Sequence, residues 1–269
     1  MVSSGNLAEK CIRETAKLSK EEYPEVNEIV HKDLYVDDCV SGEANIKLAK
    51  KRADELELVL NRGGFSLKGV AFSGEKPPDS LSDDATTITV AGQKWHTEED
   101  KISLNLGNMT FVKKKRGKTP DDAPVNIVPK KLTRRHCVSK VAEIFDLTGK
   151  FTPLTCAMKI DLHELVQWKL QWDDIIPDEL RSICLNHFEL IQEMKHIKFN
   201  RAIVPSDAAN LDIETIGFGD ASKSLLCVAI YARFLRKNGK YSSQLVLSRS
   251  KLIPDEMTMP RSELYAALS

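Results

Sequence analysis

Residues 34–40 read Leu34-Tyr35-Val36-Asp37-Asp38-Cys39-Val40, and this stretch is the sharpest feature of the 269-residue sequence. Two adjacent carboxylates, Asp37 and Asp38, are flanked by apolar residues. The pattern predicts a tight β-hairpin whose tip carries the charge. Such a tip can bind a divalent cation, since Mg²⁺ takes one or two carboxylates plus substrate phosphates. A solvated turn is the other interpretation of a bare Asp-Asp pair, because Asp favours turns.

The segments around this hairpin alternate between helix and strand patterns. Apolar residues recur at helical spacing over residues 7–18 and again over residues 43–60, where Gly63 and Gly64 provide a stop. Residues 87–91 and 101–106 alternate as short strands. Three further helical patterns cover residues 133–145, 154–170 and 177–197.

The last part of the chain is rich in strand patterns. Strands are predicted at residues 213–218, 225–235 and 241–248, and a helix begins near Arg261. Asp220 would close the first strand and Glu263 would lie on the helix. Three antiparallel strands allow that helix to pack back and bring Glu263 near Asp220, and converging carboxylates can hold the metal ions of a nuclease. A strand-end turn and an exposed helix residue are the structural alternatives.

A basic stretch lies between the two halves. Residues 113–135 contain nine basic residues against two acidic ones in a chain with 39 basic and 39 acidic residues overall. Contact with a nucleic-acid backbone by counterion release is one role for such a stretch, and a solvated loop is the other. The candidate contact residues are Lys113, Lys114, Lys115, Arg116, Lys118, Lys130, Lys131, Arg134 and Arg135.

Composition sets the class of protein. Hydrophobic residues make up 42% of the chain and charged residues 29%, as in globular proteins. No apolar run approaches the roughly 20 residues of a membrane span, and charges interrupt the place of a secretory signal. The six cysteines form no C-x-x-C pair, which favours free thiols in a reducing compartment. We therefore predict an intracellular protein, in cytoplasm or nucleus, without a membrane partner.

Tyr35-Val36-Asp37-Asp38 resembles the active-site motif of reverse transcriptases, and further motifs extend the resemblance over nearly the whole chain. Together they are similar to the polyprotein of the BEL/Pao family of LTR retrotransposons. These motifs are residues 53–65, Ala91-Gly92-Gln93-Lys94-Trp95, residues 132–149, Trp172-Asp173-Asp174-Ile175-Ile176-Pro177, Gly219-Asp220-Ala221-Ser222, and Met259-Pro260-Arg261-Ser262-Glu263-Leu264.

The resemblance implies an α+β chain in three parts. Residues 1–110 would be the end of a reverse-transcriptase palm and thumb, residues 111–205 a basic loop and helical connection, and residues 206–269 the start of an RNase H-like sheet. The connection region is often labelled a peptidase in this family, yet the Asp-Thr/Ser-Gly triplet of aspartic proteases is absent. Gly219 stands where the family pattern has Ser, and Leu147-Thr148 stands where it has Pro-Leu, which indicates a diverged copy.

The implied parent activity is RNA-directed DNA polymerase with RNase H. Its cofactor would be Mg²⁺ or Mn²⁺, held by Asp37, Asp38, Asp220 and Glu263 with further carboxylates. Because those further carboxylates are expected upstream and downstream, we predict an inactive fragment that does not bind the ions tightly. The implied partners are an RNA–DNA hybrid or other nucleic acid and the remainder of the polyprotein. Two alternatives are a non-catalytic nucleic-acid-binding remnant and a protein-interaction module built from the central helices.

Overall fold

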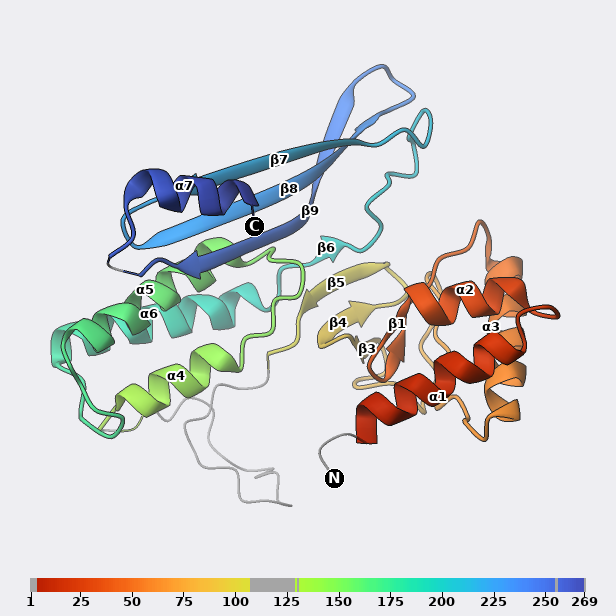
Figure 1. Ribbon diagram of the computed structural model, residues 1–269, viewed down its shortest axis with the longest axis horizontal. Coiled ribbons are helices and arrows are strands. Elements are labelled where there is room, and N and C mark those ends of the chain that lie inside the picture. Colours follow the sequence, from red (N-terminus) through yellow and green to blue (C-terminus); the bar gives the residue numbers. More distant parts are fainter. Residues whose placement is uncertain (1–3, 107–128, 130, 255, 269) are drawn as a thin grey trace. The chain divides into compact units, whose positions relative to one another are not determined.

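The computed structural model describes residues 4–106, 129, 131–254 and 256–268 (Figure 1). The chain forms two compact units, residues 1–102 and residues 103–269. Helices and sheets occur in both, which confirms the predicted α+β class. Within the described ranges, every helix is too short or too polar to cross a lipid bilayer. The predicted division near residue 205 stays a prediction.

The first unit consists of helices, a small hairpin and a second hairpin. Its elements are α1 (Ser4–Leu18), α2 (Pro24–Lys32), β1 (Leu34–Tyr35), β2 (Asp38–Cys39), α3 (Ile46–Arg62), β3 (Thr87–Val90) and β4 (Gln93–His96). β5 (Lys101–Leu104) runs across the boundary into the second unit. The three helices pack around a small core of Ala16, Val26, Val30 and Val59. Burial of these apolar side chains holds the first unit together.

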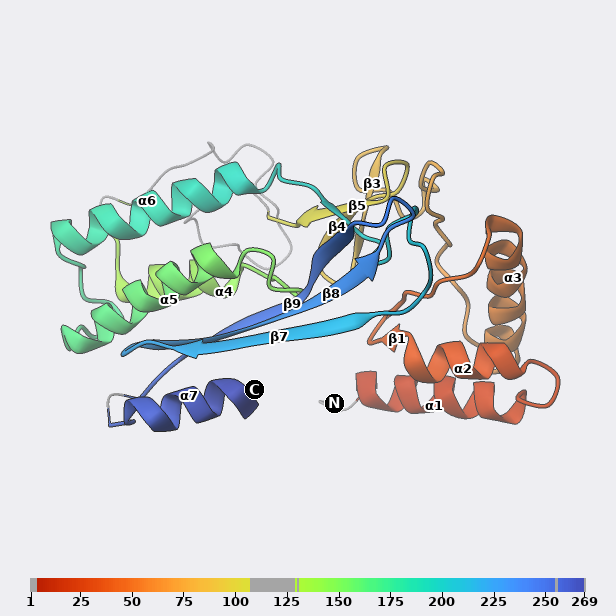
Figure 2. The same ribbon diagram turned by 90° about the horizontal axis from the view of Figure 1, so that it is seen from above.

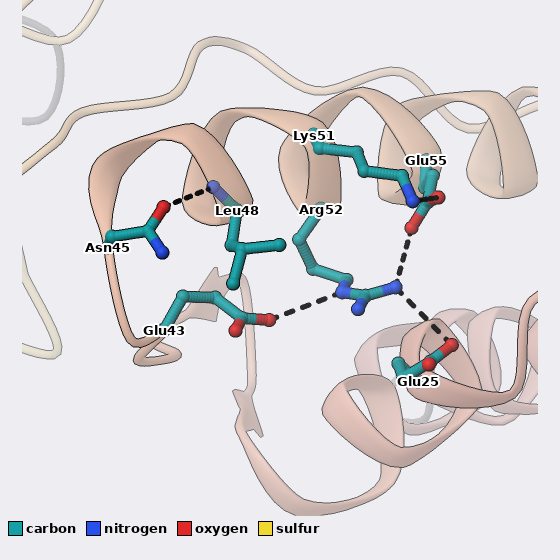
Figure 3. Close-up of polar contacts among 7 residues, drawn as sticks. All are labelled: Glu25, Glu43, Asn45, Leu48, Lys51, Arg52 and Glu55. Atoms are coloured by element: carbon teal, nitrogen blue, oxygen red, sulfur yellow. Dashed lines mark hydrogen bonds and ion pairs between the residues drawn. The ribbon is translucent and has the colours of Figure 1, made fainter.

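Helix α3 is held in place by a polar network around one arginine (Figure 3). Asn45 caps the helix, since its Oδ1 accepts the Leu48 N–H at 3.0 Å. The Arg52 guanidinium contacts Glu55 at 2.6 Å on its own helix, Glu43 at 3.2 Å in the preceding loop, and Glu25 at 3.4 Å on α2. Arg52 therefore joins three segments of the first unit.

The second unit combines a helical core with a three-stranded sheet. Its elements after β5 are α4 (Arg134–Ala142), α5 (Thr152–Gln167), α6 (Asp178–Met194), β6 (Phe199–Asn200), β7 (Glu214–Ala221), β8 (Leu225–Leu235), β9 (Tyr241–Leu252) and α7 (Met259–Leu268). The strands pair antiparallel in the order β7-β8-β9, with an irregularity at Ile230 and Tyr231. All three predicted strands are confirmed, and the first and third are longer than expected.

The two faces of this sheet are covered by different helices. Figure 2 shows α7 on one side of the strands and α5 on the other. On the α7 side, Ala266 packs with Leu226 and Ile253. On the α5 side, the helical core buries Phe151, Met158 and Leu165 among α4, α5 and α6. The sheet therefore lies between two layers of helices.

A single glycine permits the contact between the α5 start and β9. Gly149 has a φ of +73°, and a Cβ at this position would lie 1.8 Å from the Ser248 carbonyl oxygen. The Ser248 N–H donates to the Thr148 carbonyl at 2.9 Å, so the loop is bonded directly to the strand. Only glycine combines this backbone conformation with so close an approach.

We expect Gly149→Ala to destabilise the second unit by about 3 kcal/mol or more, because both the dihedral angle and the clash oppose a side chain. Hydrogen exchange of the α5 amides would measure the loss. Gly217→Ala is the matched control, since Gly217 lies in β7 with nothing within 4 Å of an added Cβ. A Gly149→Ala protein as stable as the Gly217→Ala protein would contradict the role given to this loop.

We expect Arg52→Ala to destabilise the first unit by about 1–2 kcal/mol, because it removes a mostly buried guanidinium that three carboxylates share. The Arg52 side chain is 16% exposed, whereas Lys51 is 67% exposed and its Nζ lies 3.6 Å from Glu55. Lys51→Ala should therefore cost less than about 0.5 kcal/mol. Amide exchange in α3 measures both variants, and equal losses would exclude the network as the cause.

Candidate functional site

The predicted Asp-Asp hairpin is present. β1 and β2 pair antiparallel, with Leu34 opposite Cys39 and Tyr35 opposite Asp38, so Val36 and Asp37 form a two-residue turn. Val36 has a φ of +55°, at a turn position where Gly or Asn is usual. A β-branched residue in this region is strained. Strain of this kind collects at functional sites, which makes the tip a candidate site on conformational grounds as well.

The two carboxylates of the hairpin have different surroundings. Asp37 is exposed at the turn, whereas Asp38 is half-buried. The Asp38 Oδ2 accepts the Ala91 N–H at 2.7 Å, and Ala91 lies in the turn between β3 and β4. One oxygen of Asp38 thus bonds the hairpin to a neighbouring turn. Asp37 is the carboxylate that remains exposed to solvent at the tip.

Asp220 and Glu263 belong to elements that pack together. α7 lies against β7, and the Ala266 carbonyl oxygen would be 3.1 Å from a Cβ at Gly219. Gly219 therefore faces α7, and strand alternation turns Asp220 to the other face of the sheet. Asp220 pairs with Cys227, whose Sγ contacts Cys156 of α5.

Glu263 is exposed on α7, the helix that covers the opposite face from Asp220. The helix packs back on the sheet as predicted, but the two carboxylates belong to different sides of it. The expected convergence of the Asp220 and Glu263 carboxylates stays a prediction.

Mg²⁺ or Mn²⁺ would need a compact set of donors in this chain. Within the ranges that the structure describes, no group of three or more His, Cys, Asp or Glu side chains could hold a metal ion. Two-metal chemistry places ions roughly 4 Å apart between shared carboxylates. The described donors, with Asp38 bonded to Ala91 and Asp220 facing away from α7, do not fit such a centre.

Of the predicted basic contacts, Lys113, Lys114, Lys115, Arg116, Lys118 and Lys130 lie outside the described residues. Lys131 is exposed. Arg134 and Arg135 both lie over the Trp172 ring, with guanidinium carbons 4.8 and 5.6 Å from its centre. Arg135 also forms a two-pronged contact with Asp173, at 2.8 and 3.0 Å. These two arginines therefore clamp the Trp172 loop to the start of α4.

The motif at residues 172–177 provides the partners of Arg134 and Arg135 in this contact. The Arg135 N–H donates to the Trp172 carbonyl at 2.9 Å, and the Ile176 N–H donates to the Leu132 carbonyl at 3.0 Å. Ile176 is buried in the helical core. Residues 132–135 and 172–177, which are far apart in the sequence, therefore form one structural unit. Both arginines contact the Trp172 ring, and Ile176 is buried in the helical core.

A cavity of about 230 Å³, lined by both polar and apolar side chains, lies where the loop before α5 meets β9. The Lys159 Nζ donates to the Ser250 carbonyl and hydroxyl oxygens, both at 2.8 Å. Burial raises the pKa of Asp146, whose carboxylate accepts the N–H groups of Lys150 and Phe151. The cavity is also lined by Arg249, Thr152, Thr155 and Ser248. Sequence patterns could not reveal this grouping, because it joins segments about ninety residues apart.

A buried Cys-His-Asp set in the helical core also escaped the sequence analysis. The His187 Nδ1 contacts the Asp161 Oδ2 at 2.5 Å between α6 and α5, and Cys184 lies one turn before His187. Cysteine nucleophiles use such partners. Cys184 is only 3% exposed, however, and its hydrogen bond with Cys137 together with burial raises its pKa. A buried protonated thiol is a poor nucleophile, so this set has a structural role.

Comparison with known families assigns the second unit to a class. A model of the Pao retrotransposon-like RNaseH-like domain matches residues 133–269. The chain belongs to that family, and the matched part is a Pao-type retrotransposon polyprotein region. No curated protein matches the chain. The BEL/Pao resemblance is thereby confirmed for the second half, while the reverse-transcriptase interpretation of residues 1–110 stays a prediction.

We expect Asp38→Ala to destabilise the first unit by about 1–2 kcal/mol, because the Ala91 N–H loses a charged acceptor. Asp37→Ala should change stability by less than about 0.5 kcal/mol, as an exposed turn residue. Asp38→Asn is the conservative comparison, since its amide oxygen can still accept that N–H. Amide exchange at Ala91 measures all three, and an unprotected Ala91 in the unaltered chain would refute the contact.

Proposed function

We propose that the chain is part of a retrotransposon Pol polyprotein whose parent enzyme is an RNA-directed DNA polymerase with RNase H. The observation that carries this proposal is the family match over residues 133–269, which covers β7, β8, β9 and α7. The hairpin of Asp37 and Asp38 supports a reverse-transcriptase origin for the first unit, as the end of a palm followed by thumb-like helices. The substrate class is an RNA–DNA hybrid.

By itself, the 269-residue chain is proposed to hold nucleic acid without polymerising or cutting it. Asp220 lies on the α5 face of the sheet, and Glu263 lies on the helix over the other face. The parent reaction requires carboxylates that converge on two Mg²⁺ or Mn²⁺ ions. Among the residues that the structure describes, no group of three or more such donors gathers, so no catalytic step is assigned to them.

Nucleic-acid contact is assigned to the basic stretch before α4. Arg134 and Arg135 are engaged by Trp172 and Asp173, which leaves the lysines and Arg116 of residues 113–131 as the proposed phosphate contacts. Such contacts release counterions and therefore weaken steeply with salt. They position a duplex without selecting its sequence.

A protein-interaction module is the second candidate. α6 exposes Ile183 and Leu190, seven residues apart and so on one side of the helix, each at 40% exposure. Apolar side chains on one helix face are the pattern of a partner-binding surface. This candidate predicts self-association or protein binding that does not depend on the basic stretch.

The deciding experiment measures binding and cleavage of a labelled RNA–DNA hybrid by the full chain. We expect binding that weakens with salt and background cleavage with Mg²⁺ or Mn²⁺. Replacing Lys113, Lys114, Lys115, Arg116 and Lys118 by Ala should reduce the slope of log K against log salt by up to about four. Arg135→Ala is the matched control and should leave that slope nearly unchanged.

Three other outcomes of this experiment would change the proposal. Cleavage that Asp220→Asn abolishes would overturn the proposal that the chain by itself does not cut the hybrid. Equal salt slopes for the two basic variants would remove the assignment of the contact to residues 113–118. Absence of hybrid binding at low salt, together with concentration-dependent self-association, would favour the interaction module.

A further inference from the structure

Two cysteines from different elements meet inside the second unit. The Sγ atoms of Cys156 on α5 and Cys227 on β8 lie 3.5 Å apart, and both residues are half-buried. A disulfide bond is about 2.05 Å long, so the sulfurs need to approach by only about 1.5 Å. Rotation of the two side chains can supply a movement of that size without separating α5 from the sheet.

Hydrogen bonds close to the two thiols hold α5 against the sheet. Lys159, one turn after Cys156, bonds to Ser250 through both its carbonyl and its hydroxyl oxygen. Ser250 is the partner of Cys227 across the β8–β9 pair, and Asp220 is its partner across the β7–β8 pair. The thiol pair therefore sits beside the candidate carboxylate, on the face of the sheet that α5 covers.

The environment of Cys227 lowers the reactivity of its thiol. Burial, and then the contact with Cys156, raises the pKa of Cys227 to about 11. At neutral pH Cys227 is mostly protonated, which slows its attack on any partner, because the thiolate is the nucleophilic form of cysteine. The short distance of 3.5 Å between the two sulfurs compensates for this, because the Cys227 thiol already lies next to any intermediate formed on Cys156.

We propose that Cys156 and Cys227 are an oxidation site, at which hydrogen peroxide forms a disulfide that locks α5 to β8. The Cys156 sulfur attacks one peroxide oxygen, the O–O bond breaks, and a sulfenic acid and water result. The Cys227 sulfur then attacks the sulfenic sulfur, an S–S bond forms, and the hydroxyl leaves as water with the Cys227 proton. Two thiols are oxidised and one peroxide is reduced to two waters.

The remaining cysteines give this proposal internal controls. Cys11 and Cys39 are exposed, on α1 and β2 of the first unit. Cys137 and Cys184 are a buried pair, at 1% and 3% exposure, in the helical core. Peroxide reaches the first two freely and the last two hardly at all. A disulfide between residues 156 and 227 therefore reports proximity and not general reactivity.

The test uses the full chain, reduced first and then treated with hydrogen peroxide. A non-reducing digest read by mass spectrometry should show the peptides of Cys156 and Cys227 joined, with the loss of two hydrogen atoms. The melting temperature should rise by several degrees, because the cross-link restricts the unfolded chain between residues 71 positions apart. A thiol reductant should reverse both changes.

Cys156→Ser should abolish the linked peptide and the rise in melting temperature, whereas Cys11→Ser should retain both. The digest of the unaltered chain decides the proposal even where a variant folds poorly. Free thiols at Cys156 and Cys227 after exposed Cys11 has been oxidised would overturn it. Cys227 joined to any other cysteine would also overturn it. Neither outcome bears on hybrid binding, which is measured separately.

Discussion

The approach of the Gly149 backbone to the Ser248 carbonyl is the constraint on which the second unit depends. It brings the loop onto β9, and the Ser248 N–H then bonds to the Thr148 carbonyl. Asp146 closes the same loop by accepting two backbone N–H groups, so α5 must begin at Thr152. The position of α5 follows from this start, which lets Lys159 bond to Ser250 on the sheet.

Some residues whose sequence pattern predicts a functional role instead stabilise this structure. Arg134 and Arg135 belong to a basic stretch, yet both stack on Trp172. The charge of an arginine says little about its partner, because the same guanidinium can stack on a ring, pair with a carboxylate or contact a phosphate. Only the position of the Trp172 loop, which returns from the far end of α5, decides between these roles.

The elements of the fold were largely predictable, because their patterns are local. The strands β7 to β9 and the helices α3, α5 and α6 all occur near their predicted residues. α2 was not predicted: it spans only nine residues and has no side-chain cap. The Asp-Asp hairpin was predicted from four residues. The partner of Asp38 was not, since Ala91 lies 53 residues away and nothing local indicates the contact.

The arrangement of the candidate carboxylates could not be predicted from the sequence, for a related reason. A one-residue shift of β7 would turn Asp220 toward α7 and Gly219 away from it. That shift is opposed by the tight contact of α7 with β7, because a Cβ at position 219 already meets the Ala266 carbonyl oxygen at 3.1 Å. Gly219 therefore suits the close approach of the helix and opposes a change of register. The face of Asp220 is thus decided by its neighbour, a residue with no side chain to carry any chemistry.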